Sequence, residues 1–340
     1  MLSNNGPLAQ RFEAALAQYL GVEHISLVAN AFLGIVLALR QMGVTSGEVI
    51  TTPFSFVATS HAIRWVGATP VFADIDPDTL NLDPEQVERH ISPQTRAILP
   101  VHIYGTPCDI SGFSTITKRH NIPVIYDAAH AFGVRNGTQS ILNYGEMSVL
   151  SFHATKVFNT FEGGAVISGD RETKLAVDRL SNFGIVNEEQ TDTIGLNAKM
   201  SEINAAIGLA QLSHVDHAIL ARKTVSQRYI RHFKGITGLR CLCDERDLDH
   251  NYYSFPILLS DDYPENREQL YARLKAHDIY ARRYYSPLIS DLPIYNNLQS
   301  ADPSNLPVAT RAASQILCLP MFPDLCEDEQ MEIIDLVSAP

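Results

Sequence analysis

Short apolar runs alternate with helix-like segments through the first half of this chain, and this alternation constrains its fold more than any other feature. Consecutive parallel strands need a crossover connection, which is usually a helix. The pattern therefore predicts an α/β fold in which helices cover both faces of a mostly parallel sheet. The predicted strands are 24–29, 49–52, 70–73, 97–102, 123–126, 149–152 and 165–168, and the predicted helices include 7–20, 33–42, 55–66, one that begins at Asp83-Pro84, and 110–120.

The organisation changes after the last of these strands. Apolar side chains recur at helical spacing over 199–234, which predicts one or two long helices. A second series begins at 250–340, with strands predicted at 253–258 and 279–284 and helices at 264–277 and 327–338. A chain of 340 residues usually exceeds a single hydrophobic core. We therefore predict a large domain over 1–225 and a smaller C-terminal α+β domain over 226–340.

An acid and a lysine each follow a predicted strand. Asp127 comes directly after Val124-Ile125-Tyr126, and Lys156 comes shortly after the strand at 149–152. The carboxyl ends of parallel strands share the edge of an open sheet where ligands bind. Taken alone, the lysine would be interpreted as a surface residue in a loop, and the aspartate as a helix cap or turn residue. Together they are the pair that pyridoxal phosphate (PLP) enzymes need: the lysine forms a Schiff base with the cofactor aldehyde, and the aspartate keeps the pyridine nitrogen protonated.

Composition argues against several other classes of protein. The chain has 26 basic and 38 acidic residues, a net charge of −12 and no run of Lys and Arg, so we expect no nucleic-acid partner. It has no apolar run of about 18 residues that would predict a membrane span. Five scattered cysteines predict a reduced, cytoplasmic protein. His214 and His217 lie one helical turn apart without further ligands at matched spacing, so we predict no metal site.

Longer segments around the lysine and the aspartate resemble the DegT/StrS family of sugar aminotransferases, which are PLP enzymes of fold type I. The resemblance covers nearly the whole chain and implies a fold type I large domain, a smaller C-terminal domain and a homodimer with shared active sites. The segments that carry it are Asp127-Ala128-Ala129-His130-Ala131-Phe132-Gly133, Ser151-Phe152-His153-Ala154-Thr155-Lys156, Glu162-Gly163-Gly164, Val101-His102-Ile103-Tyr104-Gly105, Gly195-Leu196-Asn197-Ala198-Lys199-Met200 and Leu319-Pro320-Met321-Phe322-Pro323.

The resemblance implies three catalytic residues. Lys156 is the lysine that bonds to PLP and then carries the proton between the substrate carbon and the cofactor. Asp127 pairs with the pyridinium nitrogen. His130 stands at the position, often glutamine in the family, that hydrogen-bonds the 3′ oxygen of the cofactor.

Further cofactor contacts are implied in the same way. Phe56 matches the aromatic residue that stacks on the cofactor ring, and Ser151 matches a donor to its phosphate. Asn197 matches a residue that reaches the phosphate of the neighbouring subunit, so the resemblance implies that the active site requires a dimer.

The chain departs from the family pattern in two places. The phosphate turn, usually Asn-Gly-Thr, reads Asn30-Ala31-Phe32 here. Backbone N–H groups at a helix N-terminus still bind phosphate, but the hydroxyl is lost, so we expect weaker cofactor retention or compensation by Ser151 and Asn197. Family members also usually carry a segment before the match that begins at Asn4. Either this is a shortened form or the start is misassigned, and we expect a shortened chain to fold around its sheet and bind substrate poorly.

The resemblance also implies the reaction. L-glutamate converts PLP to pyridoxamine 5′-phosphate (PMP), which then aminates a keto sugar nucleotide. The segments 154–160 and 281–285 are similar to those of enzymes that aminate dTDP-4-keto-6-deoxyglucose to dTDP-4-amino-4,6-dideoxyglucose, a sugar for the O-antigen of lipopolysaccharide or for glycosylated metabolites. Tyr284 and Tyr285 either border the sugar pocket or form a buried core pair.

Three alternatives stay open on the sequence. The first is amination at C3 of a 3-keto isomer. The second is a PLP sugar dehydratase, although that branch of the family has histidine in place of the lysine. The third is a non-catalytic homologue that binds a sugar nucleotide or a partner subunit. Lys156 counts against the last two, because a binding module has no use for a lysine that bonds to PLP.

The altered phosphate turn gives a first prediction. The Phe32→Thr protein should hold PLP roughly tenfold more tightly, because a hydrogen bond to a charged group contributes about 1.5 kcal/mol. A Phe32→Val protein removes the ring without supplying a hydroxyl and is the matched control. Absorbance titration of PLP gives the dissociation constants, and equal constants for the Thr and Val proteins would contradict the prediction.

Overall fold

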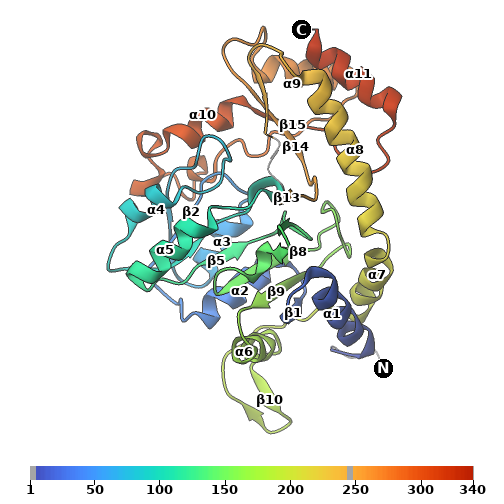
Figure 1. The fold of residues 1–340 in the computed structure, drawn as a ribbon. Helices are drawn as coiled ribbons and strands as arrows, with labels where there is room; N and C mark the ends of the chain where they lie inside the picture. The colour runs from blue at the N-terminus through green and yellow to red at the C-terminus, as the bar shows by residue number, and fades with distance from the viewer. Residues whose placement is uncertain (1–4, 243–247, 340) are drawn as a thin grey trace.

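The computed structural model describes residues 5–242 and 248–339, and its centre is one mixed β-sheet (Figure 1). The strand order is β3-β2-β4-β5-β8-β9-β1, since the parallel bridges Ile98↔Val124 and Val101↔Asp127 join the β4 and β5 edges. Only β9 runs antiparallel to its neighbours, β8 and β1. The strands are β1 (His24–Val28), β2 (Glu48–Thr51), β3 (Thr69–Phe72), β4 (Thr95–Leu99), β5 (Ile125–Asp127), β8 (Met147–Ser151) and β9 (Gly164–Ser168).

Helices cover both faces of this sheet, as the alternation predicted. On one face, the core contains side chains from α2, α3 and α6, and on the other it contains side chains from α1, α4, α5 and α7. The strands divide their residues accordingly: Val49 and Val149 face the first group, while Ile50 and Leu150 face the second. These helices are α1 (Pro7–Leu20), α2 (Ala31–Gln41), α3 (Ala58–Trp65), α4 (Pro84–His90), α5 (Ile110–His120), α6 (Arg171–Ser181) and α7 (Glu202–Leu212).

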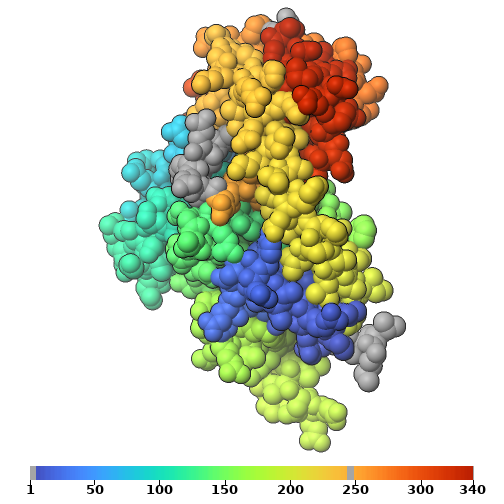
Figure 2. All heavy atoms as spheres, turned by 45° about the vertical axis from the view of Figure 1, so that its right-hand side comes forward, coloured from blue at the N-terminus to red at the C-terminus, as the bar shows by residue number. Residues whose placement is uncertain are grey.

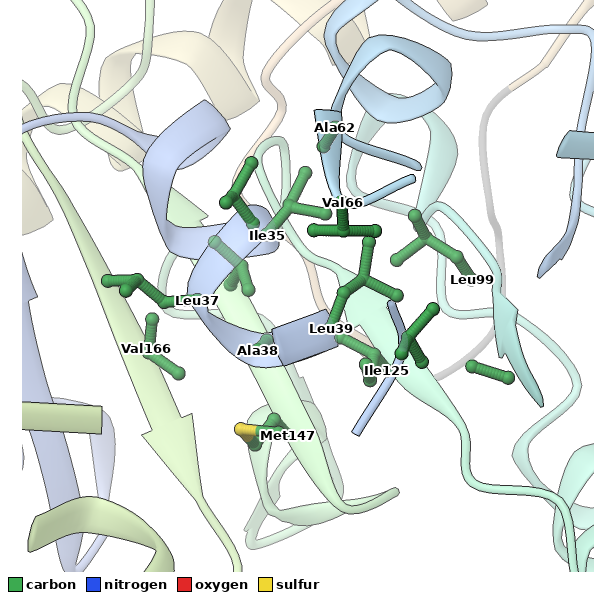
Figure 3. Close-up of a cluster of buried hydrophobic side chains, with 14 of the residues drawn as sticks. Ile35, Leu37, Ala38, Leu39, Ala62, Val66, Leu99, Ile125, Met147 and Val166 are labelled. Atoms are coloured by element: carbon green, nitrogen blue, oxygen red, sulfur yellow. The ribbon is translucent and has the colours of Figure 1, made fainter. Parts of the chain in front are cut away.

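Helix α2 lies at the centre of the first face (Figure 3). The Asn30 side chain caps it by accepting a hydrogen bond of 2.9 Å from the Leu33 amide. Its middle is apolar on every side, and Leu37 and Leu39 are buried against strands β9 and β5 (Figure 3). Burying a leucine side chain contributes about 2 kcal/mol, so this packing fixes where α2 begins relative to the sheet edge.

The C-terminal part forms a second, smaller α+β layer. Its antiparallel sheet has the order β12-β14-β15, and it packs with α8, α9 and α11 around a separate core. Helix α8 runs along the molecule from α7 to α11 (Figures 1 and 2). The predicted domain boundary after residue 225 lies within this helix, and the division into two domains stays a prediction. The elements are α8 (Val215–Phe233), α9 (Arg267–Ala276), α10 (Pro307–Gln315), α11 (Glu327–Ser338), β12 (Leu239–Cys241), β14 (Phe255–Leu259) and β15 (Ile316–Leu319).

The structure contradicts one expected strand, and it contains helices α6 and α10 and strand β15, which the sequence analysis did not predict. A strand was expected over 279–284, but only Arg282 forms a bridge there, with Cys318. The backbone turns at Asp278, where φ is 60°, so the segment reaches the outer edge of β15 only at Arg282. The sequence pattern did not identify β15, because its four apolar residues lack the alternation of a half-buried strand.

Short elements complete the described chain. The β10–β11 hairpin projects from one end of the molecule (Figures 1 and 2). No helix in 5–242 or 248–339 is long and apolar enough to cross a membrane. The remaining elements are β6 (Arg135–Asn136), β7 (Gln139–Ser140), β10 (Ile185–Asn187), β11 (Gln190–Thr191), β13 (Leu248–Asp249), and the 3₁₀ turns Ile103–Gly105, Ile141–Asn143, Ile289–Asp291, Gln299–Ala301 and Pro303–Asn305.

A buried carboxylate joins the central sheet to helix α10. Asp74 follows β3, is 4% exposed, and accepts hydrogen bonds of 2.9 and 2.8 Å from the Val308 and Ala309 amides. Helix α10 has no side-chain cap of its own at Leu306. Asp74 therefore supplies the cap from a distant segment, with its negative charge at the positive end of the helix.

The Asp74→Ala protein should lose about 3 kcal/mol of unfolding free energy, because two buried amides lose their acceptor. The Asp83→Ala protein is the control, since Asp83 caps α4 at an exposed site through the Glu85 amide, and it should lose about 1 kcal/mol. Urea unfolding measures both. Equal losses would show that Asp74 does not connect the two layers.

Candidate active site

The predicted acid and lysine both lie at the carboxyl edge of the central sheet. Strand β5 ends at Asp127, and β8 ends at Ser151. The chain then loops through Lys156, whose amide donates to the His153 carbonyl at 2.9 Å, and returns into β9. Gly163 makes this loop possible, because a Cβ there would lie 2.3 Å from the Thr160 hydroxyl.

Asp127 is held by hydrogen bonds that favour its charged form. Its carboxylate accepts from the Thr59 hydroxyl at 2.8 Å and from the Ala129 amide at 3.1 Å. The carboxyl is 4% exposed, and burial raises its pKa, while these two donors and the charge of Lys156 oppose the rise. The Ser55 hydroxyl lies 3.2 Å from the Thr59 hydroxyl and continues this hydrogen-bonded chain. The two donors and the lysine charge favour the carboxylate form, which is the form that can hold a protonated nitrogen at this edge.

Lys156 has the electrostatics of a reactive amine. Burial lowers the pKa of its ammonium to about 8, and the charge of Asp127 partly opposes this shift. Its Nζ donates to the Tyr253 hydroxyl at 3.4 Å. A pKa near the working pH lets an amine bind a proton and release it again.

His130 is neutral, and its contacts define which nitrogen carries the proton. Burial lowers its pKa well below the usual value, and the ring is 3% exposed. The Tyr104 amide, which can only donate, contacts Nδ1 at 3.3 Å. Nε2 therefore carries the proton, and it lies 3.0 Å from the Tyr285 hydroxyl. His130 thus offers an N–H donor, the group that a cofactor oxygen requires.

The predicted phosphate site is the N-terminus of α2. Gly164 of β9 lets it approach, because a Cβ there would lie 2.9 Å from the Ala31 nitrogen. The first amides of a helix favour an anion. Phe32, in place of the family's threonine, makes an edge contact with Trp65 at 6.4 Å between ring centroids. Ser151 ends β8 and is buried.

Two predicted cofactor residues are exposed in the single chain. Phe56 is 61% exposed and lies one turn before Thr59, so its ring is accessible to a ligand. Asn197 is exposed beside the β10–β11 hairpin, and its side-chain oxygen accepts from Lys199 at 3.0 Å. It is outside the set of described residues that line the cavity containing Lys156. The roles of both residues stay predictions.

A cavity of about 860 Å³ opens beside Lys156, between the central sheet and the C-terminal layer. Tyr284 lines it, together with Arg222, Arg282 and Tyr253. Tyr285 instead is 8% exposed and its hydroxyl meets His130. The two adjacent tyrosines therefore face different surroundings, one the cavity and one the interior.

Sequence reasoning missed Thr59, Tyr104 and Tyr253. Thr59 lies three residues after Phe56, but its partner Asp127 is 68 positions away. Tyr253 was predicted only as part of a strand, and its contact with Lys156 spans 97 positions. No local pattern signals such contacts, because the partners lie far apart along the chain.

The residues at this edge fit PLP. A lysine with a lowered pKa, a hydrogen-bonded aspartate, a neutral histidine donor and the N-terminus of α2 match the aldehyde, the ring nitrogen, the 3′ oxygen and the phosphate. Among the residues described, no group of His, Cys, Asp and Glu has the arrangement of a metal site. The fold and the site together are those of a PLP-dependent aminotransferase of fold type I.

Comparison with known proteins gives the family. The chain belongs to the DegT/DnrJ/EryC1/StrS aminotransferase family, whose match spans residues 1–338. The family is PLP-dependent, so the chain is a PLP-dependent sugar aminotransferase.

Individual relatives are similar over nearly their whole length. The dTDP-4-amino-4,6-dideoxy-D-glucose transaminase of Escherichia coli is 46% identical over 99% of this chain and 91% of its own. The dTDP-3-amino-3,4,6-trideoxy-alpha-D-glucose transaminase of Streptomyces venezuelae is 31% identical over 98% and 86%. A crystal structure of DesI in the presence of its TDP-sugar product matches with a TM-score of 0.93 and 36% identity, over 99% of this chain and 85% of that one.

The hydrogen bond from Thr59 predicts a pH effect on stability. The folded-state pKa of Asp127 is raised above the ordinary carboxyl value. Between these two pKa values the folded state binds more protons than the unfolded state. The unfolding free energy therefore falls as the pH rises from the ordinary pKa to the folded-state pKa. Removing the Thr59 donor raises that pKa further. The Thr59→Val protein should therefore lose more unfolding free energy at pH 7 than at acid pH, by about 1.4 kcal/mol per pKa unit.

The Thr59→Ser protein keeps the hydroxyl and is the control for the loss of a methyl group. Urea unfolding of PLP-free protein over a pH series measures the difference. A cost for Thr59→Val that does not change with pH would show that the hydroxyl does not stabilise the charged form of Asp127.

Proposed function

We propose that this protein moves the amino group of L-glutamate to C4 of dTDP-4-keto-6-deoxyglucose, giving dTDP-4-amino-4,6-dideoxyglucose. The observation that carries the proposal is the pairing of Lys156 and Asp127 at one sheet edge, in a chain 46% identical to a transaminase named for that product. The relative named for a 3-amino sugar is 31% identical, which favours C4 over C3.

The side chains divide the chemistry between them. When bound, PLP supplies an electron sink for the carbon that gains or loses the amino group. Lys156 Nζ takes the proton from that carbon and returns it, which its lowered pKa allows near neutral pH. The Asp127 carboxylate would hold a proton on the ring nitrogen, and Nε2 of His130, which carries the ring proton, would donate to the 3′ oxygen.

We also propose that the active sites are shared in a homodimer. Asn197 lies beside the projecting β10–β11 hairpin, where apolar side chains are unusually exposed for a monomer surface. These side chains are Phe183, Ile185, Val186, Ile194 and Leu196. A partner that covers them would bring Asn197 of each chain to the α2 N-terminus of the other.

The proposed setting is cytoplasmic sugar-nucleotide metabolism that supplies O-antigen of lipopolysaccharide or glycosylated metabolites. Free cysteines support a reducing compartment, and they are Cys108, Cys241, Cys318 and Cys326 in the described part of the chain.

The reaction is tested with L-glutamate labelled with nitrogen-15 and dTDP-4-keto-6-deoxyglucose. We expect the label at C4 of the sugar by NMR, and a loss of roughly 10²–10⁴-fold in rate for Lys156→Ala, the range of general acid–base catalysis. Label at C3 would overturn the proposed position. A deoxygenated product without nitrogen would favour a dehydratase, and no product from the parent protein would favour a binding role. Full label transfer by Lys156→Ala would overturn the role proposed for Lys156.

Sharing of the site is tested by complementation. Co-expressed Lys156→Ala and Asn197→Ala chains carry different tags, so that the mixed dimer can be purified. If Asn197 acts in the partner's site, one site of this dimer is intact, and roughly half of the activity of the parent dimer should return. A mixed dimer as inactive as Lys156→Ala alone would show that Asn197 serves its own chain, and failure of the two tags to co-purify would show that no dimer forms.

A further inference from the structure

Tyr253 contacts both Lys156 and His130, although it comes from the connection that leads into the C-terminal layer. Its ring stacks on the His130 ring with 4.4 Å between centroids and 10° between planes. Its hydroxyl lies 3.4 Å from Lys156 Nζ, which is 4.9 Å from the centre of the ring. One side chain therefore touches the amine and packs over the histidine expected beside the cofactor's 3′ oxygen.

Two buried polar groups hold the backbone at this position. The Asn251 side chain is 1% exposed; its oxygen accepts from the Tyr253 amide at 3.1 Å, and its nitrogen donates to the His130 carbonyl at 2.8 Å. Arg222 is 7% exposed and donates to the carbonyls of Tyr253 and Met321, at 3.4 and 2.9 Å. Breaking hydrogen bonds from a buried guanidinium is costly, so these two bonds hold the segment against the Lys156 cavity.

We propose that Tyr253 is a positioning residue for Lys156, which holds the amine at the reacting carbon while it carries the proton. The inference rests on the proposed aminotransferase function and adds a residue to it. A free lysine side chain samples many rotamers, and a reacting group held in one orientation gains rate from proximity. The ring attracts the ammonium through its π face, and the hydroxyl gives Nζ a hydrogen-bond partner.

The Tyr253 hydroxyl and ring contribute separately, so two variants separate them. Tyr253→Phe keeps the stack on His130 and the ring under Nζ but removes the hydroxyl, whereas Tyr253→Leu removes both. Tyr229→Phe is the control for the loss of a buried hydroxyl, because Tyr229 lies in the C-terminal core and donates to the Pro320 carbonyl at 3.1 Å.

The first measurement is the single-turnover conversion of bound PLP to PMP by L-glutamate, followed by absorbance. We expect the maximal rate to fall roughly tenfold for Tyr253→Phe and about a hundredfold for Tyr253→Leu, with little change in the half-saturating glutamate concentration, since an oriented amine matters in the transition state. The Tyr229→Phe rate should equal that of the parent. Unchanged rates in both Tyr253 proteins would overturn the inference.

The second measurement needs no PLP. The rate at which an amine reagent modifies Lys156 is followed by peptide mass spectrometry over a pH series. Without the ring, the ammonium loses a stabilising contact, so its apparent pKa should fall by about half a unit to one unit in Tyr253→Leu. An unchanged pH profile would overturn the inference. If the parent protein does not react with L-glutamate but the pKa of Lys156 still falls in Tyr253→Leu, only the proposed reaction is overturned.

Discussion

The buried carboxylate of Asp127 is the interaction on which the rest of the site depends. A carboxylate that is 4% exposed stays ionised only if donors and a cation compensate its burial. The structure supplies them from three directions: Thr59 from α3, the Ala129 amide from the following turn, and Lys156 from the loop after β8. Each of these elements packs onto the same sheet, so the fold and the electrostatics of the site cannot be separated.

The second constraint is how the C-terminal layer meets the central sheet. Asp74 caps α10 across the junction, and the Tyr104 hydroxyl donates to the Tyr284 carbonyl. Tyr285 and Tyr253 then approach His130 from this layer. The cavity beside Lys156 is therefore lined by both layers, and its shape depends on contacts that lie outside the catalytic residues themselves.

The sequence predicted the parts of the site that follow strand ends. Asp127 and Lys156 could be placed because the spacing of apolar residues locates the strands, and the strand ends determine which residues reach the sheet edge. The family resemblance added His130. Thr59 and Tyr253 could not be found, since their partners lie far along the chain. The strand expected over 279–284 was wrong because the segment meets the sheet only at Arg282, which bridges Cys318 of β15, after a backbone turn at Asp278. Local pattern does not determine which apolar run takes a sheet edge.

The central claim is that Lys156 is the residue that bonds to PLP. The most direct measurement is reduction of the PLP-loaded protein with borohydride, followed by peptide mass spectrometry. The account predicts one stable pyridoxyl phosphate group, on the peptide that contains Lys156. A group on another lysine, such as Lys199, or no group at all would contradict it.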